Sequence, residues 1–476
     1  MLDADPITFR PVLRSCLAGG LALLGATADV AAAEPLRLHP DNPHYFLWRD
    51  RPTVLVTSGE HYGAVLNRDF DYKKYLATLE SLHFNLTRTF TGAYCEHPGA
   101  FNIQRNTLAP AQDKLICPWA RSDTPGYGHG GNKFDLTRYD PAYFKRLADF
   151  VAEAGRRGVV VELVFFCPFY KDRMWQLSPM NAANNVNGIG TMKREEVYTL
   201  KHPELLAVQQ AVVRKIVREL RDADNLYYEI CNEPYFGGVT LAWQARIATT
   251  IVEAEKDFKH KHLIAQNIAN KSRKIEKPDP HVSIFNFHYA KPPTAVADNY
   301  HLRRPIGDDE TGFAKKKPGP YRMEAWDFML AGGAIVNNLD YGYTCGREDG
   351  TDDPEAPGSR GRAIQKQLSI LKRFIESFEF TAMKPDDSVI KKVDGKAKTS
   401  ARALVEPSQA CAVYLRGQGP AKLALALPDG TYQAEWLDTK TGTVAKSERI
   451  RAKNGLADLT SPPFKDDIAL SLRRRR

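Results

Sequence analysis

Two acidic side chains, Glu233 and Glu310, each follow a short apolar run and stand beside a turn. The run Leu226 to Cys231 is apolar and aromatic, which predicts a buried strand. Pro234 ends that strand because proline cannot extend a ladder of backbone hydrogen bonds, and Gly312 ends the second run in a similar turn. Carboxyl groups from two strands can share acid, base and nucleophilic roles. The sequence therefore predicts a site built on paired carboxyl groups.

Strands and helices alternate around these two motifs, which predicts a parallel α/β fold. Strands are expected near residues 54–57, 83–90, 158–166, 226–231, 263–268, 282–288, 304–310 and 334–339. Helices are expected near residues 72–82, 140–151, 204–220, 241–258, 321–330 and 364–378. In a barrel of parallel strands, catalytic groups stand at the carboxyl ends of the strands, which is where both motifs fall.

The pair of motifs, Asn232-Glu233-Pro234 after one strand and Glu310-Thr311-Gly312 after a later one, resembles a large clan of retaining glycoside hydrolases. The clan contains many cellulases, mannanases and β-galactosidases, and its fold is a (β/α)8 TIM barrel. The resemblance covers roughly residues 45 to 380 in the order of elements. It implies eight strands, with Glu233 as the acid/base at the end of the fourth and Glu310 as the nucleophile at the end of the seventh.

The chemistry implied by this resemblance sets two requirements. The two carboxyl groups must lie about 5 to 5.5 Å apart for one to attack the sugar while the other protonates the leaving oxygen. We also expect the pKa of Glu233 to be raised by the neighbouring negative charge and by aromatic packing, so that it holds a proton near neutral pH.

The resemblance also implies residues that bind the substrate or support the acidic pair. Arg88, at the end of the second strand, is expected to hold the nucleophile, and Asn232 to bind the sugar 2-hydroxyl. His288 and Tyr289 end the sixth strand, where the clan often has a His and a Tyr two residues apart. Because these two are adjacent, strand alternation lets only one point straight inward, and His288 is the stronger candidate.

The sequence defines the roles of several other polar and aromatic residues less clearly than those of the acidic pair. Glu60 and His61 follow the first strand, where a sugar contact and an ordinary turn hydrogen bond are equally good interpretations. Tyr341 is a candidate sugar platform in place of the clan's usual Trp. Asp308 shares the face of Glu310 by alternation, one step deeper, and Glu162 has the setting of a paired core carboxylate; both are expected to be structural.

Two long segments, residues 91–139 and 168–201, lack clear periodicity and are rich in aromatic residues. Loops of such length in a compact domain usually serve a site or are disordered. The aromatic residues favour a site, because sugar rings expose apolar C–H faces that stack on aromatic rings.

The first 33 residues have the pattern of a secretory signal peptide, cleaved after Ala33. Arg10 and Arg14 precede an apolar run that is too short for a permanent membrane span, and three alanines precede the cleavage point. This predicts a secreted or periplasmic protein, the alternative being a disordered or membrane-skimming N-terminus. Residues 34–384 are expected to form the barrel, and residues 385–476, with short strands and tight turns, a small β-sandwich that buttresses the barrel or binds glycan.

Composition narrows the class of protein further. The formal net charge of +9 is scattered, which favours a solvated surface over a site for anionic glycans; we expect no nucleic-acid partner. Cys95 and Cys117 flank a long loop and could pair after export, but no spacing typical of zinc ligands occurs. We expect no metal and no cofactor.

The sequence thus predicts a retaining glycoside hydrolase that cleaves β-glycosidic bonds in a polysaccharide or oligosaccharide. The alternative is a barrel protein that binds glycan without turnover. No Gly-x-Ser-x-Gly or His-Glu-x-x-His motif supports an esterase or a protease. The motifs around Glu233 and Glu310 do not determine the sugar, the linkage, endo or exo action, or the oligomeric state.

Overall fold

The computed structural model describes residues 34–475 except residues 315 and 397. The predicted signal peptide, residues 1–33, lies outside this part of the chain. Among the described helices, none combines the length and the apolar character needed to cross a membrane.

The core is a parallel eight-stranded sheet in the order β4-β13-β12-β11-β10-β9-β8-β5, so the predicted TIM barrel is confirmed. Asn85 joins its two outer members: the amide N–H of Val56 donates to Asn85 Oδ1 (3.0 Å), and Asn85 Nδ2 donates to the carbonyl of Val54 (2.8 Å). The strands are β4 Leu55–Gly59, β5 Leu86–Phe90, β8 Val160–Phe166, β9 Leu226–Cys231, β10 Leu263–Asn270, β11 Ile284–His288, β12 Ile306–Thr311 and β13 Ile335–Leu339.

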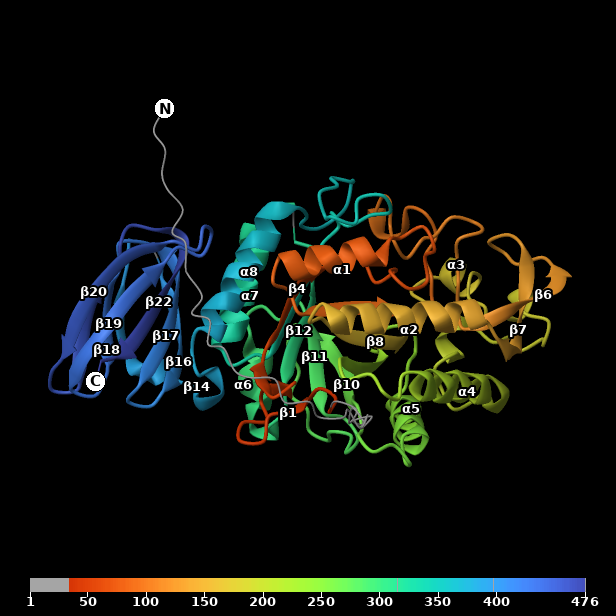
Figure 1. The fold of residues 1–476 in the computed structure, drawn as a ribbon, viewed down its shortest axis with the longest axis horizontal. Coiled ribbons are helices and arrows are strands. Elements are labelled where there is room, and N and C mark those ends of the chain that lie inside the picture. The colour runs from red at the N-terminus through yellow and green to blue at the C-terminus, as the bar shows by residue number, and fades with distance from the viewer. Residues whose placement is uncertain (1–33, 315, 397, 476) are drawn as a thin grey trace, which may run out of the picture. The chain divides into compact units, whose positions relative to one another are not determined.

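Helices surround the barrel strands (Figure 1). Their starts follow the chain's capping signals: Asp71 accepts from two backbone amides at the start of α1, and Asp140 with Pro141 begins α2. The α-helices are α1 Tyr72–Ser81, α2 Pro141–Arg156, α3 Asp172–Trp175, α4 Pro203–Glu219, α5 Leu241–Ala254, α6 Thr294–Asn299, α7 Gly319–Leu330 and α8 Arg362–Glu376.

Residues 91–139, expected to lack regular elements, contain an antiparallel pair, β6 (Trp119–Pro125) and β7 (Asn132–Tyr139). The register of this pair shifts twice, which explains why the sequence shows no steady alternation of apolar and polar residues. An isolated bridge from Phe134 to Asn185 ties this hairpin to the second long loop. The two loops therefore pack together.

The C-terminal strands form a six-stranded sheet, β14-β16-β17-β22-β19-β20, and a three-stranded sheet, β15-β18-β21, with one apolar cluster of their own. A further sheet, β1-β2-β3, precedes the barrel. The bounds are β1 Arg37–Leu38, β2 Phe46–Trp48, β3 Arg51–Thr53, β14 Lys384–Pro385, β15 Ile390–Asp394, β16 Ser400–Glu406, β17 Ala410–Gln418, β18 Lys422–Ala426, β19 Gly430–Leu437, β20 Val444–Ala452, β21 Leu456–Thr460 and β22 Lys465–Arg474.

The disulfide that Cys95 and Cys117 could form is not present. Cys95 and Cys117 are buried free thiols, and the thiol of Cys117 donates to the carbonyl of Trp119 (3.7 Å). The other described cysteines are free as well. Burial raises the pKa of both Cys95 and Cys117 to about 12, so these thiols stay protonated at neutral pH.

A buried ion pair joins the barrel to the sandwich. Arg322 of α7 donates from Nη2 to Asp467 of β22 (2.5 Å), and both side chains are almost inaccessible to solvent. Tyr414 and Thr439 donate to the other oxygen of Asp467, so this carboxylate is fully coordinated. Such a pair fixes the geometry, and removing one partner leaves an uncompensated buried charge.

Asp467→Asn should therefore lower the free energy of unfolding by about 3 kcal/mol, because the Arg322 guanidinium loses its counter-ion in a buried setting. Urea unfolding at neutral pH measures the change. Asp466→Asn is the matched control, since its pair with Lys440 is partly exposed and should contribute less than about 1 kcal/mol. Equal small losses in both variants would contradict the structural role of the buried pair.

Candidate active site

A cavity of about 510 Å³ opens over the carboxyl ends of the barrel strands. Its walls are mainly aromatic, and its polar groups are mostly carboxyl, amide and amine groups. The aromatic and polar lining residues include Tyr62, Phe90, Phe101, Tyr170, Phe236, Tyr289, Phe313, Glu96, Asn232, Glu233, Asn270, Lys271, Lys291, Glu310 and Glu324. Aromatic walls with a few convergent polar groups are typical of a small-molecule site.

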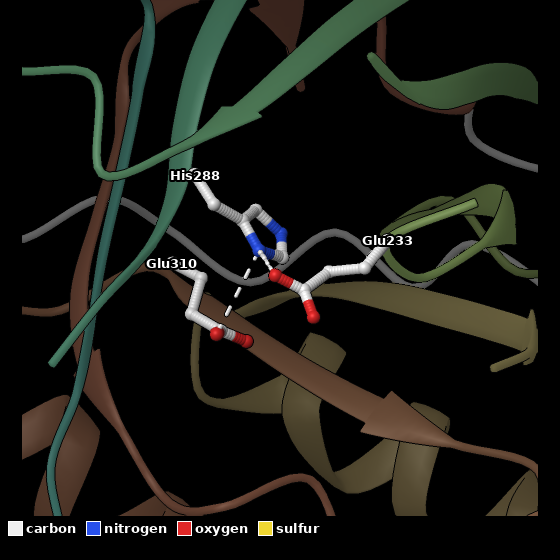
Figure 2. A group of neighbouring side chains, drawn as sticks. All are labelled: Glu233, His288 and Glu310. Atoms are coloured by element: carbon white, nitrogen blue, oxygen red, sulfur yellow. Dashed lines mark hydrogen bonds and ion pairs between the residues drawn. The ribbon is translucent and has the colours of Figure 1, made fainter. Parts of the chain in front are cut away.

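Glu233 and Glu310 face each other in this cavity, with His288 between them (Figure 2). One carboxylate oxygen of each, together with a ring nitrogen of His288, lie within 4.8 Å of one another. His288 Nδ1 is 3.2 Å from Glu233 Oε1 and 3.7 Å from Glu310 Oε1. The structure thus brings together the two acidic side chains that the sequence singled out.

Glu233 follows β9 with a φ of 37°, a left-handed conformation that is costly for a residue with a Cβ. This turn allows Asn232 and Glu233, although adjacent, to line the same cavity. Tyr170 donates to Glu233 Oε2 (2.6 Å) and Tyr235 to Oε1 (3.2 Å). Strain at such a position is typical of functional residues.

The expected raised pKa of Glu233 is wrong. Burial alone would raise this pKa, but hydrogen bonds from His288, Tyr170 and Tyr235 stabilise the carboxylate and hold its pKa below the ordinary value. Burial and the like charge of Glu310 alone would raise the pKa, and these donors outweigh both.

Glu310 receives two phenol donors, Tyr62 to Oε2 (2.7 Å) and Tyr289 to Oε1 (2.5 Å). Burial and the neighbouring carboxylate raise the pKa of both phenols well above the ordinary value, so they remain donors. Strand alternation favoured His288 over Tyr289, but a φ of 54° at Tyr289 breaks that alternation. Both His288 and Tyr289 therefore reach the acidic pair.

Arg88 is fully buried, and it contacts other groups more closely than Glu310, the residue it was expected to hold. Its Nη2 donates to Glu229 Oε1 (2.5 Å) and to Asn232 Oδ1 (2.7 Å). Its Nη1 lies 3.6 Å from Glu310 Oε2, an ion-pair distance rather than a hydrogen bond. Arg88 thus holds the base of the site and the amide of Asn232, while the two phenols hold Glu310.

Beneath Arg88 lie three fully buried carboxyl groups, those of Glu162, Glu229 and Asp309. Asn286 Nδ2 joins two of them, donating to Glu162 Oε1 (2.8 Å) and Glu229 Oε2 (2.9 Å). Burial and the charge of Glu229 raise the pKa of Glu162 to about 8. Glu162 is thus a core carboxyl group, as its apolar strand predicted.

The described residues contain two groups with the ligand spacing that a metal ion requires, Glu233-His288-Glu310 and Glu162-Glu229-Asp309. The second group already surrounds the Arg88 guanidinium, which supplies a positive charge there. In the first group, the carboxylates of Glu233 and Glu310 accept hydrogen bonds from tyrosine phenols.

Strand β12 departs from regular alternation. Its register shifts between Asp308 and Thr311, so Asp309 and Glu310 both face the barrel interior. Asp308 instead accepts from the backbone N–H of Ala290 (3.2 Å), outside the acidic pair. The expectation that Asp308 shares the face of Glu310 is therefore wrong, although Asp308 is buried and structural as predicted.

The residues after β4 separate into a structural one and a lining one. Glu60 accepts from the backbone amides of Gly63 and Ala64, both at 3.0 Å, so it makes the ordinary turn contact. His61 lines the cavity, with Nε2 3.6 Å from Glu96 Oε2.

Tyr341 is 2 % exposed and stacks on His61, and the described lining residues do not include it. Phe313, which is 44 % exposed, is the aromatic ring open to the cavity from that side.

The sequence argument missed the phenols of Tyr62, Tyr170 and Tyr235 as ligands of the acidic pair. Each stands within a few residues of a strand end, and of the three only Tyr170 lies in a segment, residues 168–201, that the sequence marked as aromatic. Their hydrogen bonds depend on how loops from different strands meet, and no spacing in the chain encodes that.

Solved structures provide the comparison with known proteins. A candidate glycoside hydrolase from Bacteroides vulgatus ATCC 8482 is 15% identical, with a TM-score of 0.65 and coverage of 94% of this chain and 84% of its own. The chain has the fold of solved glycoside hydrolases. A family 5 glycoside hydrolase from the same organism is 14% identical, with a TM-score of 0.62 and coverage of 92% and 93%. No protein-family model and no curated protein matches the chain.

Glu162 predicts a pH effect on stability. Its pKa is raised to about 8 in the folded chain, so the folded chain keeps a proton that the unfolded chain loses above its ordinary pKa of 4.5. This stabilisation is complete below pH 4.5 and is lost as the pH rises toward 8. The urea midpoint should fall between about pH 5.5 and 7.5, and it should fall less in Glu162→Gln, which mimics the protonated group. Parallel pH curves for the two proteins would rule out the buried proton.

Proposed function

We propose that this protein is a retaining glycoside hydrolase that cleaves β-glycosidic bonds by double displacement. The observation that carries the proposal is that one carboxylate oxygen of Glu233 and one of Glu310 lie within 4.8 Å of each other in an aromatic cavity. Retaining enzymes place their carboxyl groups about 5 to 5.5 Å apart, whereas inverting enzymes leave about 6.5 to 9.5 Å for a water molecule. The shared fold of solved glycoside hydrolases adds support.

The donors around each carboxyl group support the division of roles. Glu310 is the nucleophile: Tyr62 and Tyr289 donate to its carboxylate and Arg88 lies 3.6 Å from it, and these contacts aim it into the cavity. It attacks the anomeric carbon and forms a glycosyl ester. The ester carries no charge, so the phenols then contact a neutral carbonyl oxygen. Hydrolysis restores the negative charge on the Glu310 carboxylate, and the phenol donors favour that step.

Glu233 is the acid/base. In the first step it protonates the leaving oxygen, and in the second it takes a proton from the attacking water. Tyr170, Tyr235 and His288 stabilise its ionised form, which suits the second step and opposes the first. The proton for the first step therefore has to be supplied against these donors.

Asn232 is proposed to bind the substrate. Its side chain bridges Arg88, through Oδ1, and Tyr170, through Nδ2 (2.9 Å), so its orientation is fixed beside Glu233. His61 and Tyr289 line the same cavity and are further contacts for sugar hydroxyls. We propose a polysaccharide or oligosaccharide substrate and a secreted or periplasmic location, the latter resting on the N-terminal sequence pattern alone.

A glycan-binding protein without turnover is the second candidate function. It predicts that some β-linked glycan binds and is never hydrolysed. The complete set of donors on both carboxyl groups favours the enzyme, since binding alone needs neither. A hydrolysis screen over polysaccharides and aryl glycosides separates the two, because product from any β-linked substrate excludes a purely binding role.

Glu310→Ala should abolish turnover, because no carboxylate remains to form the glycosyl ester. Azide should restore part of the rate and give a glycosyl azide of inverted configuration, since azide enters the space left on the nucleophile side. The anomeric configuration is read by proton NMR. A product of retained configuration would assign Glu310 to the acid/base role instead.

Glu233→Ala should slow the hydrolysis of natural glycosides about 100-fold or more, since their leaving oxygen needs a proton. Aryl glycosides with activated leaving groups need no such proton, so their first step should be nearly unaffected. Burst kinetics separate the two steps. Equal losses on both kinds of substrate would contradict the assignment of Glu233 as the acid.

A further inference from the structure

His288 connects the acidic pair to a deeper carboxyl group. Its Nδ1 faces Glu233 Oε1 at 3.2 Å, and its Nε2 faces Asp309 Oδ1 at 3.4 Å. Both His288 and Asp309 are 0 % exposed. Among the described residues, Nε2 of His288 and both carboxyl oxygens of Asp309 have no partner with hydrogen-bond geometry. Nε2 of His288 and Oδ1 of Asp309, neither of which has a hydrogen-bond partner, thus lie 3.4 Å apart.

We propose that Asp309 is a positioning residue that stores the proton delivered by Glu233 and passes it through His288. The inference rests on the proposed function of Glu233 as the acid. It explains how a carboxyl group surrounded by donors obtains the proton that the first step requires.

The proton movement is balanced. Asp309 begins protonated and donates from its carboxyl group to Nε2 of neutral His288, whose Nδ1–H donates to ionised Glu233. Two protons then shift: one from Asp309 to Nε2, and one from Nδ1 to Glu233. Asp309 becomes a carboxylate, His288 stays neutral with its proton on Nε2, and Glu233 becomes the acid. The base role of Glu233 in the second step returns a proton by the reverse path.

The surroundings of Asp309 favour a stored proton. Burial and the nearby Glu162 and Glu229 raise the pKa of Asp309 well above the ordinary value, against the opposing charge of Arg88. The charged and titratable groups that act on Asp309 are Arg88 of β5, Glu162 of β8, Tyr227 and Glu229 of β9, His288 of β11, and the phenols of Tyr62 and Tyr235. Of these, Tyr235 and His288 contact Glu233, and in the described ion pairs and hydrogen bonds His288 is the one that also reaches Asp309.

The chain offers a matched control for Asp309. Glu162 is equally buried and lies 3.6 Å from Arg88 Nε, against 3.5 Å for Asp309. In the described ion pairs Glu162 does not contact His288. A purely structural effect on Arg88 should therefore be similar in Glu162→Gln and Asp309→Asn, whereas loss of the relay should appear only in the second.

Asp309→Asn keeps the size of the side chain and a donor for Nε2, but it removes the transferable proton. With natural glycosides, kcat/KM should fall about 10- to 100-fold, and the alkaline limb of its pH profile should move to lower pH, because Glu233 must take its proton from solvent. With activated aryl glycosides the first step should change less than about 2-fold. Glu162→Gln removes a carboxyl group that helps to raise the pKa of Asp309 but keeps the Asp309 proton, so its alkaline limb should move less than that of Asp309→Asn. A wild-type profile for Asp309→Asn, or equal shifts in both variants, would overturn the proposal.

A second measurement needs no substrate, so it remains decisive if the protein hydrolyses none. The ¹⁵N NMR signals of His288 can be assigned among the 12 histidines by comparison with His288→Gln. The free protein near neutral pH should carry the His288 proton on Nδ1 and a bare Nε2, because Asp309 donates to Nε2. A proton on Nε2 in that state would mean that Asp309 is an ionised acceptor with nothing to transfer, and it would refute the relay. Failure of the glycan screen with a bare Nε2 would instead count against the proposed function.

Discussion

The site depends on one buried guanidinium. Arg88 stands in the barrel interior with Glu162, Glu229, Asp309 and Glu310 all within ion-pair distance. Several negative charges cannot be buried around a single cation at acceptable cost, so some of these groups must hold protons. Arg88 stabilises Glu229 and leaves protons to Glu162 and Asp309, whose pKa values are raised. The raised pKa values of Glu162 and Asp309 follow from burial and from this excess of carboxyl groups.

Above Arg88, two turns in the left-handed region bring the functional groups together. At Glu233 and at Tyr289, a positive φ lets adjacent residues face the same cavity, which a regular strand forbids. The shifted register in β12 does the same for Asp309 and Glu310. The dense packing of polar groups at the rim thus comes from local departures from strand geometry, which the barrel behind them holds in place.

Much of the fold and the identity of the acidic pair could be predicted from the sequence. Short apolar runs predict the strands, and Pro234 and Gly312 mark where two of them end. The donors of the pair could not be predicted, because Tyr62 and Tyr170 reach it from loops whose path depends on tertiary packing. Strand alternation gave the wrong answer at Tyr289 and Asp308, where the backbone is irregular. The raised pKa expected for Glu233 was wrong, because that expectation considered burial without the hydrogen-bond donors.

The most direct test of the central claim is to trap the intermediate. The protein would be incubated with 2-deoxy-2-fluoro β-glycosides that carry activated leaving groups, over a set of common sugars, and then digested and analysed by mass spectrometry. The account predicts one stoichiometric glycosyl adduct, on the peptide that contains Glu310 and on the Glu310 side chain. An adduct on Glu233 or on another residue, or hydrolysis of the parent glycosides with inversion and no adduct, would contradict it.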